Sequence, residues 1–431
     1  MSSLLAALLS LLLAGTTLAS PPQWELDQRL GRAAARGDLE AVLAALEAGA
    51  ELDAIVAADG TNSTALEKAI YREHWEVAWL LLERGAALRR VDDLGVWPAA
   101  LAAAHGNTEL LGAIVTRARS DDPSADFGYA LIRAAGEGKA GALELLLAAG
   151  VDPNTLPREN MPTALANAAR RGEPEIAHRL LDRGARPRAW ERQGLRAAEA
   201  AAIHADRVLL ARIASLAPAA EPGALYGPAA AQASWYGHTE TLVDLLALGV
   251  EATAVVDNSF LFDIPGGGQR DRPPQPLLAY ATDEQRWSSA RLLLDAGADP
   301  VGGDVLGRAA GAGSLEMVRD LETRGVDLHA EGVCGNALSA LARRRAGDEP
   351  ALLETAVFLL GHGVDPNLPC EGRLPLTWLS DGDTQLAVAY RAAGARAGTT
   401  MAYKFRQARR AVRGAATQAV LVVAVLLGGG M

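Results

Sequence analysis

The chain has 431 residues and a formal net charge of −11, and half of its residues are hydrophobic although only 5% are aromatic. The acidic balance excludes a nucleic-acid partner, because such a partner needs a basic face. Seven scattered histidines and two cysteines show no metal-ligand spacing, so we expect neither a metal nor a cofactor.

The amino-terminal segment, residues 1–20, contains a short apolar run from Leu4 to Leu13 that is followed by small residues. This pattern predicts a secretory signal peptide that is cleaved near Ala19 or Ser20. The alternative is an anchor that is not cleaved. Residues 21–29 then form a short lead-in to the rest of the chain.

Residues 134–154, AAGEGKAGALELLLAAGVDPN, predict a pair of helices joined by a tight turn. Ala134 and Ala135 allow close helix packing, and Gly138 suits the left-handed conformation of the turn. Leu143, Leu146 and Leu147 form an apolar stripe on the second helix. A single pair cannot bury its apolar surface on both sides, so it requires neighbouring copies.

Copies of this pattern recur about every 33 residues along the chain. The positions equivalent to Gly138 are Gly37, Glu73, Gly106, Gly172, His204, Gly237, Gln285, Gly313 and Asp383. The repeated pattern resembles the ankyrin-repeat family, whose units read TPLH, A-A-x-x-G, a leucine run and G-A-D. About eleven such units fit between residues 30 and 396. Thr64 and Thr163 hold the family's threonine, whereas no unit keeps its TPLH histidine.

The resemblance implies an all-α solenoid of helix–turn–helix units, with atypical terminal units as caps and a concave face that binds other proteins. The two positions before each turn residue are contact positions in such proteins. Trp235 and Tyr236 stand out among them because aromatic residues dominate binding hot spots, although Trp235 would also suit packing against the next repeat. The expected contact residues are Tyr71, Arg72, His105, Arg170, Arg171, Trp235, Tyr236, Asp283 and Glu284.

An insertion at residues 252–275 interrupts the repeats. Its three consecutive glycines are not a phosphate loop, because no lysine, serine or threonine follows in the required place. The insertion is either a flexible excursion or a functional loop with the apolar tip Phe260-Leu261-Phe262. No catalytic motif occurs in the chain, so we expect a protein that is not an enzyme.

Cys334 and Cys370 fall in the loops before the first helices of two successive repeats. In an exported protein they could form a disulfide. Their positions differ by about two residues in register, so two free thiols are the alternative.

After the repeats, residues 397–413 form a basic linker and residues 414–431 an apolar tail. The tail is at the lower limit of length for a transmembrane helix, and its alternative is a buried or frayed terminal helix.

These patterns together predict a bacterial, exported, periplasmic or cell-envelope scaffold that binds a protein partner and is tethered to the membrane by its carboxyl end. Two alternatives stay open: a secreted effector that binds a protein of a foreign cell, and a cytoplasmic tail-anchored scaffold. An enzyme with its site in the inserted loop is the least favoured.

Overall fold

The computed structural model describes residues 21–57, 62–88, 97–158, 161–187, 197–216, 222–256, 274–301, 304–332, 334–344, 350–379 and 384–398. Nearly all the regular structure in these ranges is helical, which confirms the all-α class. The chain divides into two compact halves, Met1–Ala197 and Ala198–Met431.

The first half consists of helix pairs that follow one another along the chain. The pairs are α2 (Gln23–Arg36) with α3 (Leu39–Glu47), α4 (Ala65–Tyr71) with α5 (Trp75–Glu83), α6 (Trp97–His105) with α7 (Thr108–Asp121), α8 (Gly128–Gly136) with α9 (Ala140–Ala148), and α10 (Ala164–Arg171) with α11 (Pro174–Asp182).

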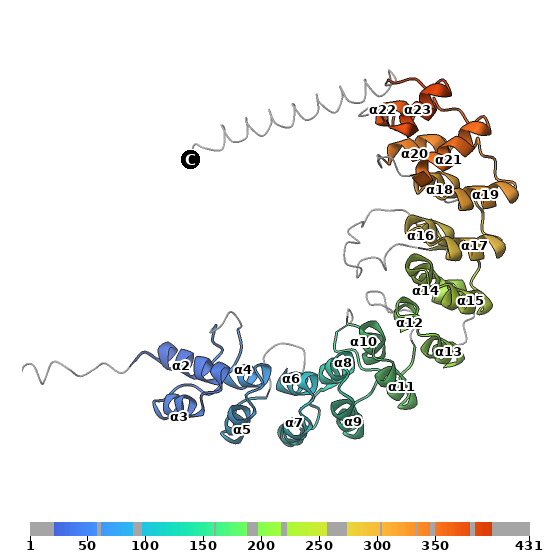
Figure 1. The fold of residues 1–431 in the computed structure, drawn as a ribbon. Coiled ribbons are helices and arrows are strands. Elements are labelled where there is room, and N and C mark those ends of the chain that lie inside the picture. Colours follow the sequence, from blue (N-terminus) through green and yellow to red (C-terminus); the bar gives the residue numbers. More distant parts are fainter. Residues whose placement is uncertain are drawn as a thin grey trace, which may run out of the picture. The chain divides into compact units, whose positions relative to one another are not determined.

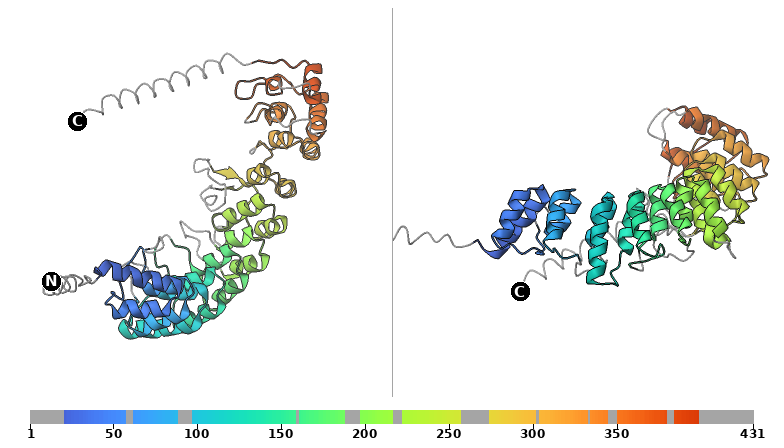
Figure 2. Two further views of the ribbon diagram at one scale, coloured as in Figure 1. Left: turned by 60° about the vertical axis from the view of Figure 1, so that its left-hand side comes forward. Right: turned by 90° about the horizontal axis from the view of Figure 1, so that it is seen from below.

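The pairs stack so that each first helix contacts the first helix of the next pair. In Figures 1 and 2 the helices α2, α4, α6, α8 and α10 form one row, the first-helix row, and their partners form a second-helix row. The core lies between the rows. Ala134, Ala135, Leu143 and Leu146 have no exposed surface there, whereas Leu147 is half-buried. The predicted stripe is therefore correct at two of its three leucines.

The second half repeats this plan. Its elements are α12 (Ala197–Ile203), α13 (Arg207–Leu216), α14 (Pro222–Tyr236), α15 (Thr239–Ala247), α16 (Leu277–Asp283), α17 (Trp287–Asp295), α18 (Val305–Gly311), α19 (Leu315–Thr323), α20 (Ala337–Arg343), α21 (Pro350–Gly361), α22 (Pro375–Trp378) and α23 (Gln385–Ala392). From α14 onward the first helices again contact one another in succession.

Where the structure describes the turns inside the helix pairs, they adopt the left-handed conformation that the glycines predict. The predicted turn position Asp383 lies outside the described residues. Three turn residues without glycine adopt the left-handed conformation too, namely Glu73 with φ 62°, Ala205 with φ 55° and Gln285 with φ 57°. The turn of the α12–α13 pair therefore centres on Ala205, so the predicted position, His204, is wrong by one residue. Without a glycine in this segment, the sequence offers no marker for the turn.

Side chains from one pair close the turn of the pair before it. The ring of His74 covers Gly37, and its Nε2 lies 3.1 Å from the carbonyl oxygen of Ala35. His238 makes the same contact with the carbonyl oxygen of Ile203 at 2.8 Å. These carbonyls lie near helix ends and have lost intrahelical donors, so the contacts satisfy them and join adjacent repeats.

The extended exits after the second helices carry a second link between repeats. Asn154 donates from Nδ2 to the carbonyl of Gly184 at 3.1 Å and accepts at Oδ1 from the backbone N–H of Arg186 at 2.8 Å. Asn367 makes the equivalent bonds with Gly394 and Arg396 at 3.3 and 2.7 Å. The exit motif VDPN thus binds the next exit as well as forming a turn.

The ends of the predicted insertion pair with each other. Strands β1 (Val255–Val256) and β2 (Gln275–Pro276) form a two-stranded antiparallel ladder in which Val255 lies opposite Pro276. Residues 257–273, including the apolar tip, lie outside the described residues.

The expectation of a transmembrane helix requires correction. Among the described residues, no helix combines the length and the apolar character that a membrane crossing demands. The longest described helix, α14, has 15 residues, fewer than a span needs. The segment on which we placed the span, residues 414–431, lies outside the described residues, as do the signal segment 1–20 and most of the basic linker.

Candidate functional site

The expected contact residues lie at the carboxyl ends of the first helices, and two hollows open there, one in each half. The hollow of the first half, which we call the α4–α8 hollow, has a volume of about 670 Å³. This size is within the usual range of ligand sites. Its lining residues are Asn62, Ser63, Glu67, Lys68, Tyr71, Glu73, Trp97, Leu101, Ala104, His105, Arg133, Glu137 and Lys139.

Apolar surface in the α4–α8 hollow comes from α4 and α6. Tyr71, at the end of α4, is 57% exposed, which is high for a large aromatic side chain. The Trp97 indole stacks on the ring of Tyr129, with 5.4 Å between centroids and 14° between planes. Leu101 and Ala104 are buried next to it in the same helix. The wall is therefore rigid and partly aromatic.

The acidic groups of this hollow have basic partners. A carboxylate oxygen of Glu73 lies 3.3 Å from Nδ1 of His105, a contact that is an ion pair only when the imidazole is protonated. Glu137 lies 3.9 Å from the Arg133 guanidinium and 3.6 Å from that of Arg171. By contrast, Lys139 has no hydrogen bond or ion pair with any residue that the structure describes, and its stem lies over Gly106. The hollow thus presents one cation without a counter-charge from the described chain.

Two further charged residues of the hollow are almost completely buried in α4. Glu67 is 3% exposed and accepts the backbone N–H of Thr64 at 2.9 Å, while the Thr64 hydroxyl accepts the N–H of Glu67. This reciprocal pair is a capping box, which satisfies two N–H groups at the helix start. Lys68 is 2% exposed. Because they are buried, Glu67 and Lys68 support the wall of the hollow and do not form its exposed rim.

The hollow of the second half, which we call the α16–α20 hollow, has a volume of about 520 Å³. Its charged side chains are held by one another and by backbone: Asp283 is paired with Arg308, and Arg344 donates to the carbonyl of Gly311 at 3.2 Å. The lining residues are Thr282, Asp283, Gln285, Asp304, Gly307, Arg308, Gly311, Cys334, Ala340, Arg343 and Arg344.

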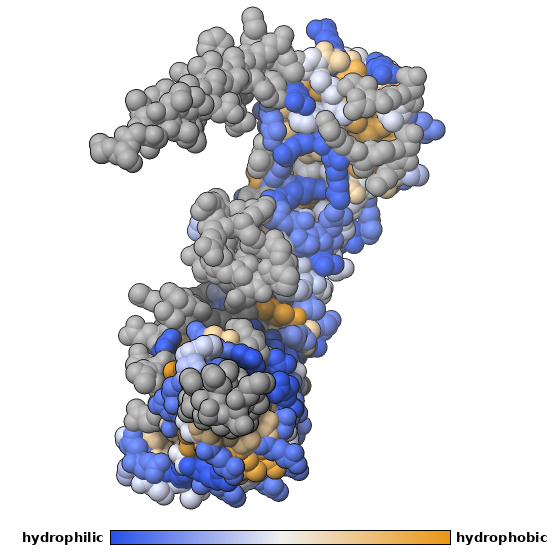
Figure 3. All heavy atoms as spheres, turned by 90° about the vertical axis from the view of Figure 1, so that its left-hand side faces the viewer, coloured by the Kyte–Doolittle hydropathy of each residue, from blue (hydrophilic) through white to orange (hydrophobic). Residues whose placement is uncertain are grey.

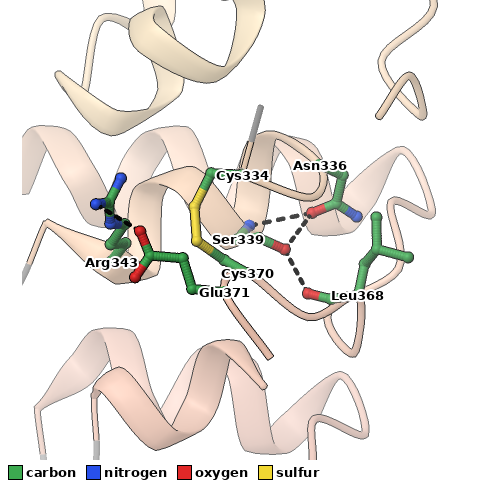
Figure 4. The surroundings of a disulfide bond; sticks show 7 residues. All are labelled: Cys334, Asn336, Ser339, Arg343, Leu368, Cys370 and Glu371. Carbon is green, nitrogen blue, oxygen red and sulfur yellow. Dashed lines mark hydrogen bonds and ion pairs between the residues drawn. A yellow bond between two sulfur atoms is a disulfide. The ribbon is translucent and has the colours of Figure 1, made fainter. Parts of the chain in front are cut away.

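Cys334, which lines this second hollow, is joined to Cys370 by a disulfide (Figure 4). The Cα atoms are 4.7 Å apart, within the range that a disulfide spans. Other bonds tie the same two loops together: Ser339 donates from Oγ to the carbonyl of Leu368 at 2.6 Å. Arg343 pairs with Glu371 at 2.8 Å beside the bridge. Of the two alternatives for these cysteines, the structure shows the disulfide.

The structure brings the predicted contact residues to different places. Tyr71 and His105 line the α4–α8 hollow, and Asp283 lines the α16–α20 hollow. The guanidinium of Arg72 lies 5.8 Å from the centroid of the Tyr71 ring. Glu284 is exposed at the end of α16 and lines neither hollow.

The two predicted arginines lie beside the first hollow. The guanidinium of Arg171 lies 3.6 Å from the carboxylate of Glu137, which lines this hollow. Arg170 donates to Oδ1 of Asn167 at 2.8 Å. The amide of Asn167 in turn donates to the carbonyl of Ile132 on α8 at 2.9 Å. These arginines therefore stiffen the row of first helices at the hollow's edge.

Trp235 and Tyr236, the residues that the sequence emphasises most, line neither hollow. Both are half-buried, and the Tyr236 ring stacks on His238 with 5.9 Å between centroids. Burial raises the pKa of the Tyr236 hydroxyl. Arg286 covers the neighbouring turn and donates to the carbonyl of Trp235 at 3.3 Å. The bond from Arg286 therefore joins this repeat to the next, whereas the stack of Tyr236 on His238 lies within one repeat.

Sequence reasoning missed the hollow residues that lie one helical turn before the predicted positions. Trp97, Leu101 and His105 follow one another at intervals of four residues along α6, and Lys68 precedes Arg72 by the same interval on α4. Residues four apart share a helix face, so this spacing was the signal that could have extended the site.

The described residues contain no group of three or more histidine, cysteine, aspartate or glutamate residues able to hold a metal ion. We found no protein-family model and no curated protein whose sequence matches this chain.

Proposed function

We propose that the chain is an exported ankyrin-type solenoid without catalytic activity, which binds a protein partner through its first-helix rows. The stacked helix pairs, the left-handed turns in register and the linked exits support the ankyrin assignment. A disulfide supports export, because such bonds persist in oxidising compartments.

The observation that carries the binding proposal is the exposed Tyr71 at the α4–α8 hollow. A tyrosine that is 57% exposed beside a fixed indole offers a large and stiff contact area at small entropic cost. In the view of Figure 3, polar and charged residues cover most of the coloured surface and the apolar patches are small. The second-helix rows carry ion pairs between neighbouring helices, such as Arg183 with Glu144, which already satisfy their charges.

Site-specific photo-crosslinking in the native host tests this proposal. A photoreactive phenylalanine analogue at Tyr71 should give one discrete protein adduct. The same analogue at Val243, which is 41% exposed on the second helix α15, is the matched control and should give none. Equal adducts from both positions, or none from Tyr71, would contradict binding through the first-helix row.

A further inference from the structure

We propose that the α4–α8 hollow recognises an extended partner segment in which an aromatic or leucine side chain lies within two residues of an aspartate or glutamate. This inference rests on the proposed function and specifies the chemistry that the site selects. It combines the apolar wall of the hollow with Lys139, the one lining cation that has no counter-charge among the residues that the structure describes.

The apolar part of the preference follows from Tyr71, Trp97 and Leu101. The Trp97 ring is held by its stacking on Tyr129, so it loses little freedom when a ligand covers it. Tyr71 can bury more than half of its surface on binding, which is a large favourable term for one side chain. A flat or branched apolar side chain of the partner is the group that removes this surface from water.

The acidic part follows from the charges around that wall. Glu137 is shared between the guanidinium groups of Arg133 and Arg171, and Glu73 lies beside His105, which is a counter-charge when it is protonated. Lys139 is half-buried and lacks any such neighbour among the described residues. A partner carboxylate beside Lys139 would gain a charge-assisted hydrogen bond in a site that is partly shielded from water.

The same charges disfavour other partners. A basic segment would approach Lys139, Arg133 and the adjacent Arg171, all of the same sign. A wholly apolar segment would cover the Lys139 ammonium without pairing it, which costs desolvation free energy. An apolar residue with a neighbouring carboxylate avoids both penalties.

A display library of random dodecapeptides, selected on the full-length protein, provides the probe. Peptides selected by the wild-type protein should be enriched in Phe, Tyr, Trp or Leu within two residues of Asp or Glu. Lys139→Glu should weaken the binding of these peptides about tenfold or more and select Lys or Arg at the acidic position. Tyr71→Ala should weaken the binding about fivefold or more, a loss that fewer than about a third of interface residues reach.

Two variants of the first half control for charge and for aromatic area. Arg84→Glu makes the same charge change at an exposed residue that follows α5 on the second-helix row. Trp24→Ala removes an aromatic side chain that is 63% exposed at the start of α2, outside the hollow. Neither should alter the selected sequences, and circular dichroism melts of all four variants check that each one is folded.

The outcomes separate this inference from the proposed function. Peptides that bind Lys139→Glu and Tyr71→Ala as well as the wild type would overturn the inference while leaving protein binding in place. Selection of basic peptides by the wild-type protein would overturn the inference as well. If the wild type selects no peptide and Tyr71 gives no crosslinked adduct, both proposals fail.

Discussion

Gly37 shows how a single turn residue depends on the next helix pair. Its φ of 72° is rarely adopted by residues with a side chain, and a methyl group there would lie 2.5 Å from Nδ1 of His74. Gly49 also has a positive φ, 95°, but no atom lies within 4 Å of the place that its Cβ would occupy. A comparison of substitutions at these two glycines therefore separates the effect of backbone strain on stability from the effect of the contact between repeats.

We predict that Gly37→Ala destabilises the protein more than Gly49→Ala. Both substitutions incur the left-handed strain of about 1–2 kcal/mol. Only the first must also displace the His74 ring and its hydrogen bond, which adds roughly 1 kcal/mol or more. Urea unfolding of the two variants measures the difference, and equal losses would show that the His74 contact contributes nothing.

Histidine position alone does not reveal this role. His74 and His238 each follow a turn residue, and each binds a carbonyl of the preceding repeat. A contact between residues roughly one repeat length apart depends on how the helix pairs stack. Periodicity within a single helix does not describe this stacking, so it does not predict the contact.

At the scale of the elements, the helices and most turns were predictable because glycine and leucine mark them in most repeats. The α12–α13 turn was not, since Ala205 adopts the left-handed conformation without a glycine to mark it. The disulfide was left open for a similar reason. Cys334 and Cys370 lie in two short loops. An isolated β-bridge joins Gly332 with Gly335 in the first loop, and another joins Cys370 with Arg373 in the second. These local folds bring cysteines of different register together.

An ion-pair cluster joins the second helices α13 and α15. Arg207 donates to both carboxylate oxygens of Asp244, at 2.5 and 2.9 Å, and to Glu240 at 3.3 Å. The hydrogen bond from Arg207 lowers the pKa of Asp244 below its usual 3.8, against the opposing effect of burial. The Asp244 carboxylate therefore contributes stability above its usual pKa, and this contribution is lost as the pH falls through the lowered value.

We predict that Arg207→Gln lowers the urea midpoint slightly at neutral pH and that the difference from wild type shrinks on acidification below the usual pKa of Asp244. High salt should also reduce the difference, because the pair is largely exposed to solvent. Arg84→Gln, which removes an exposed arginine that has no side-chain partner in the part of the chain that the structure describes, is the control. A difference that persists unchanged in acid would show that the Arg207 stem, and not its charge, supports the helices.

At the scale of the whole molecule, stability in a stacked array is a sum of local contributions, because each pair contacts only its neighbours. The disulfide therefore acts on the pairs that it joins. It closes a separation of 36 residues, for which chain entropy gives a stabilisation of about 4 kcal/mol.

We predict that reduction with dithiothreitol speeds amide hydrogen exchange in α20 to α23 and leaves α2 to α11 unchanged. The double variant Cys334→Ser/Cys370→Ser should match the reduced protein and should not respond to dithiothreitol. Exchange that rises equally throughout the chain would contradict local action, and unchanged exchange in α20 to α23 would show that the bridge stabilises nothing.

The last described helix pair, α22 with α23, packs against the pair before it, α20 with α21, and we predict that it acts as a cap. Leu376, Leu386 and Tyr390 of α22 and α23 are almost fully buried, and the Tyr390 hydroxyl donates to the carbonyl of Leu338 on α20 at 2.7 Å. Burial raises the pKa of that hydroxyl far above its usual value, so it stays protonated and keeps donating at any physiological pH.

Deletion of this pair should uncover the apolar side of α20 and α21, including Leu338 and Leu359, which have no exposed surface in the intact protein. We predict that a chain ending before Leu374 aggregates at concentrations where a chain ending at Gly398 stays monodisperse in light scattering. Exposed apolar area of this kind associates when no polar cap covers it. Substituting Leu338 and Leu359 with polar residues in the shortened chain should restore solubility if this surface is the cause. A shortened chain that is soluble and melts at the original temperature would show that α22 and α23 are not a cap.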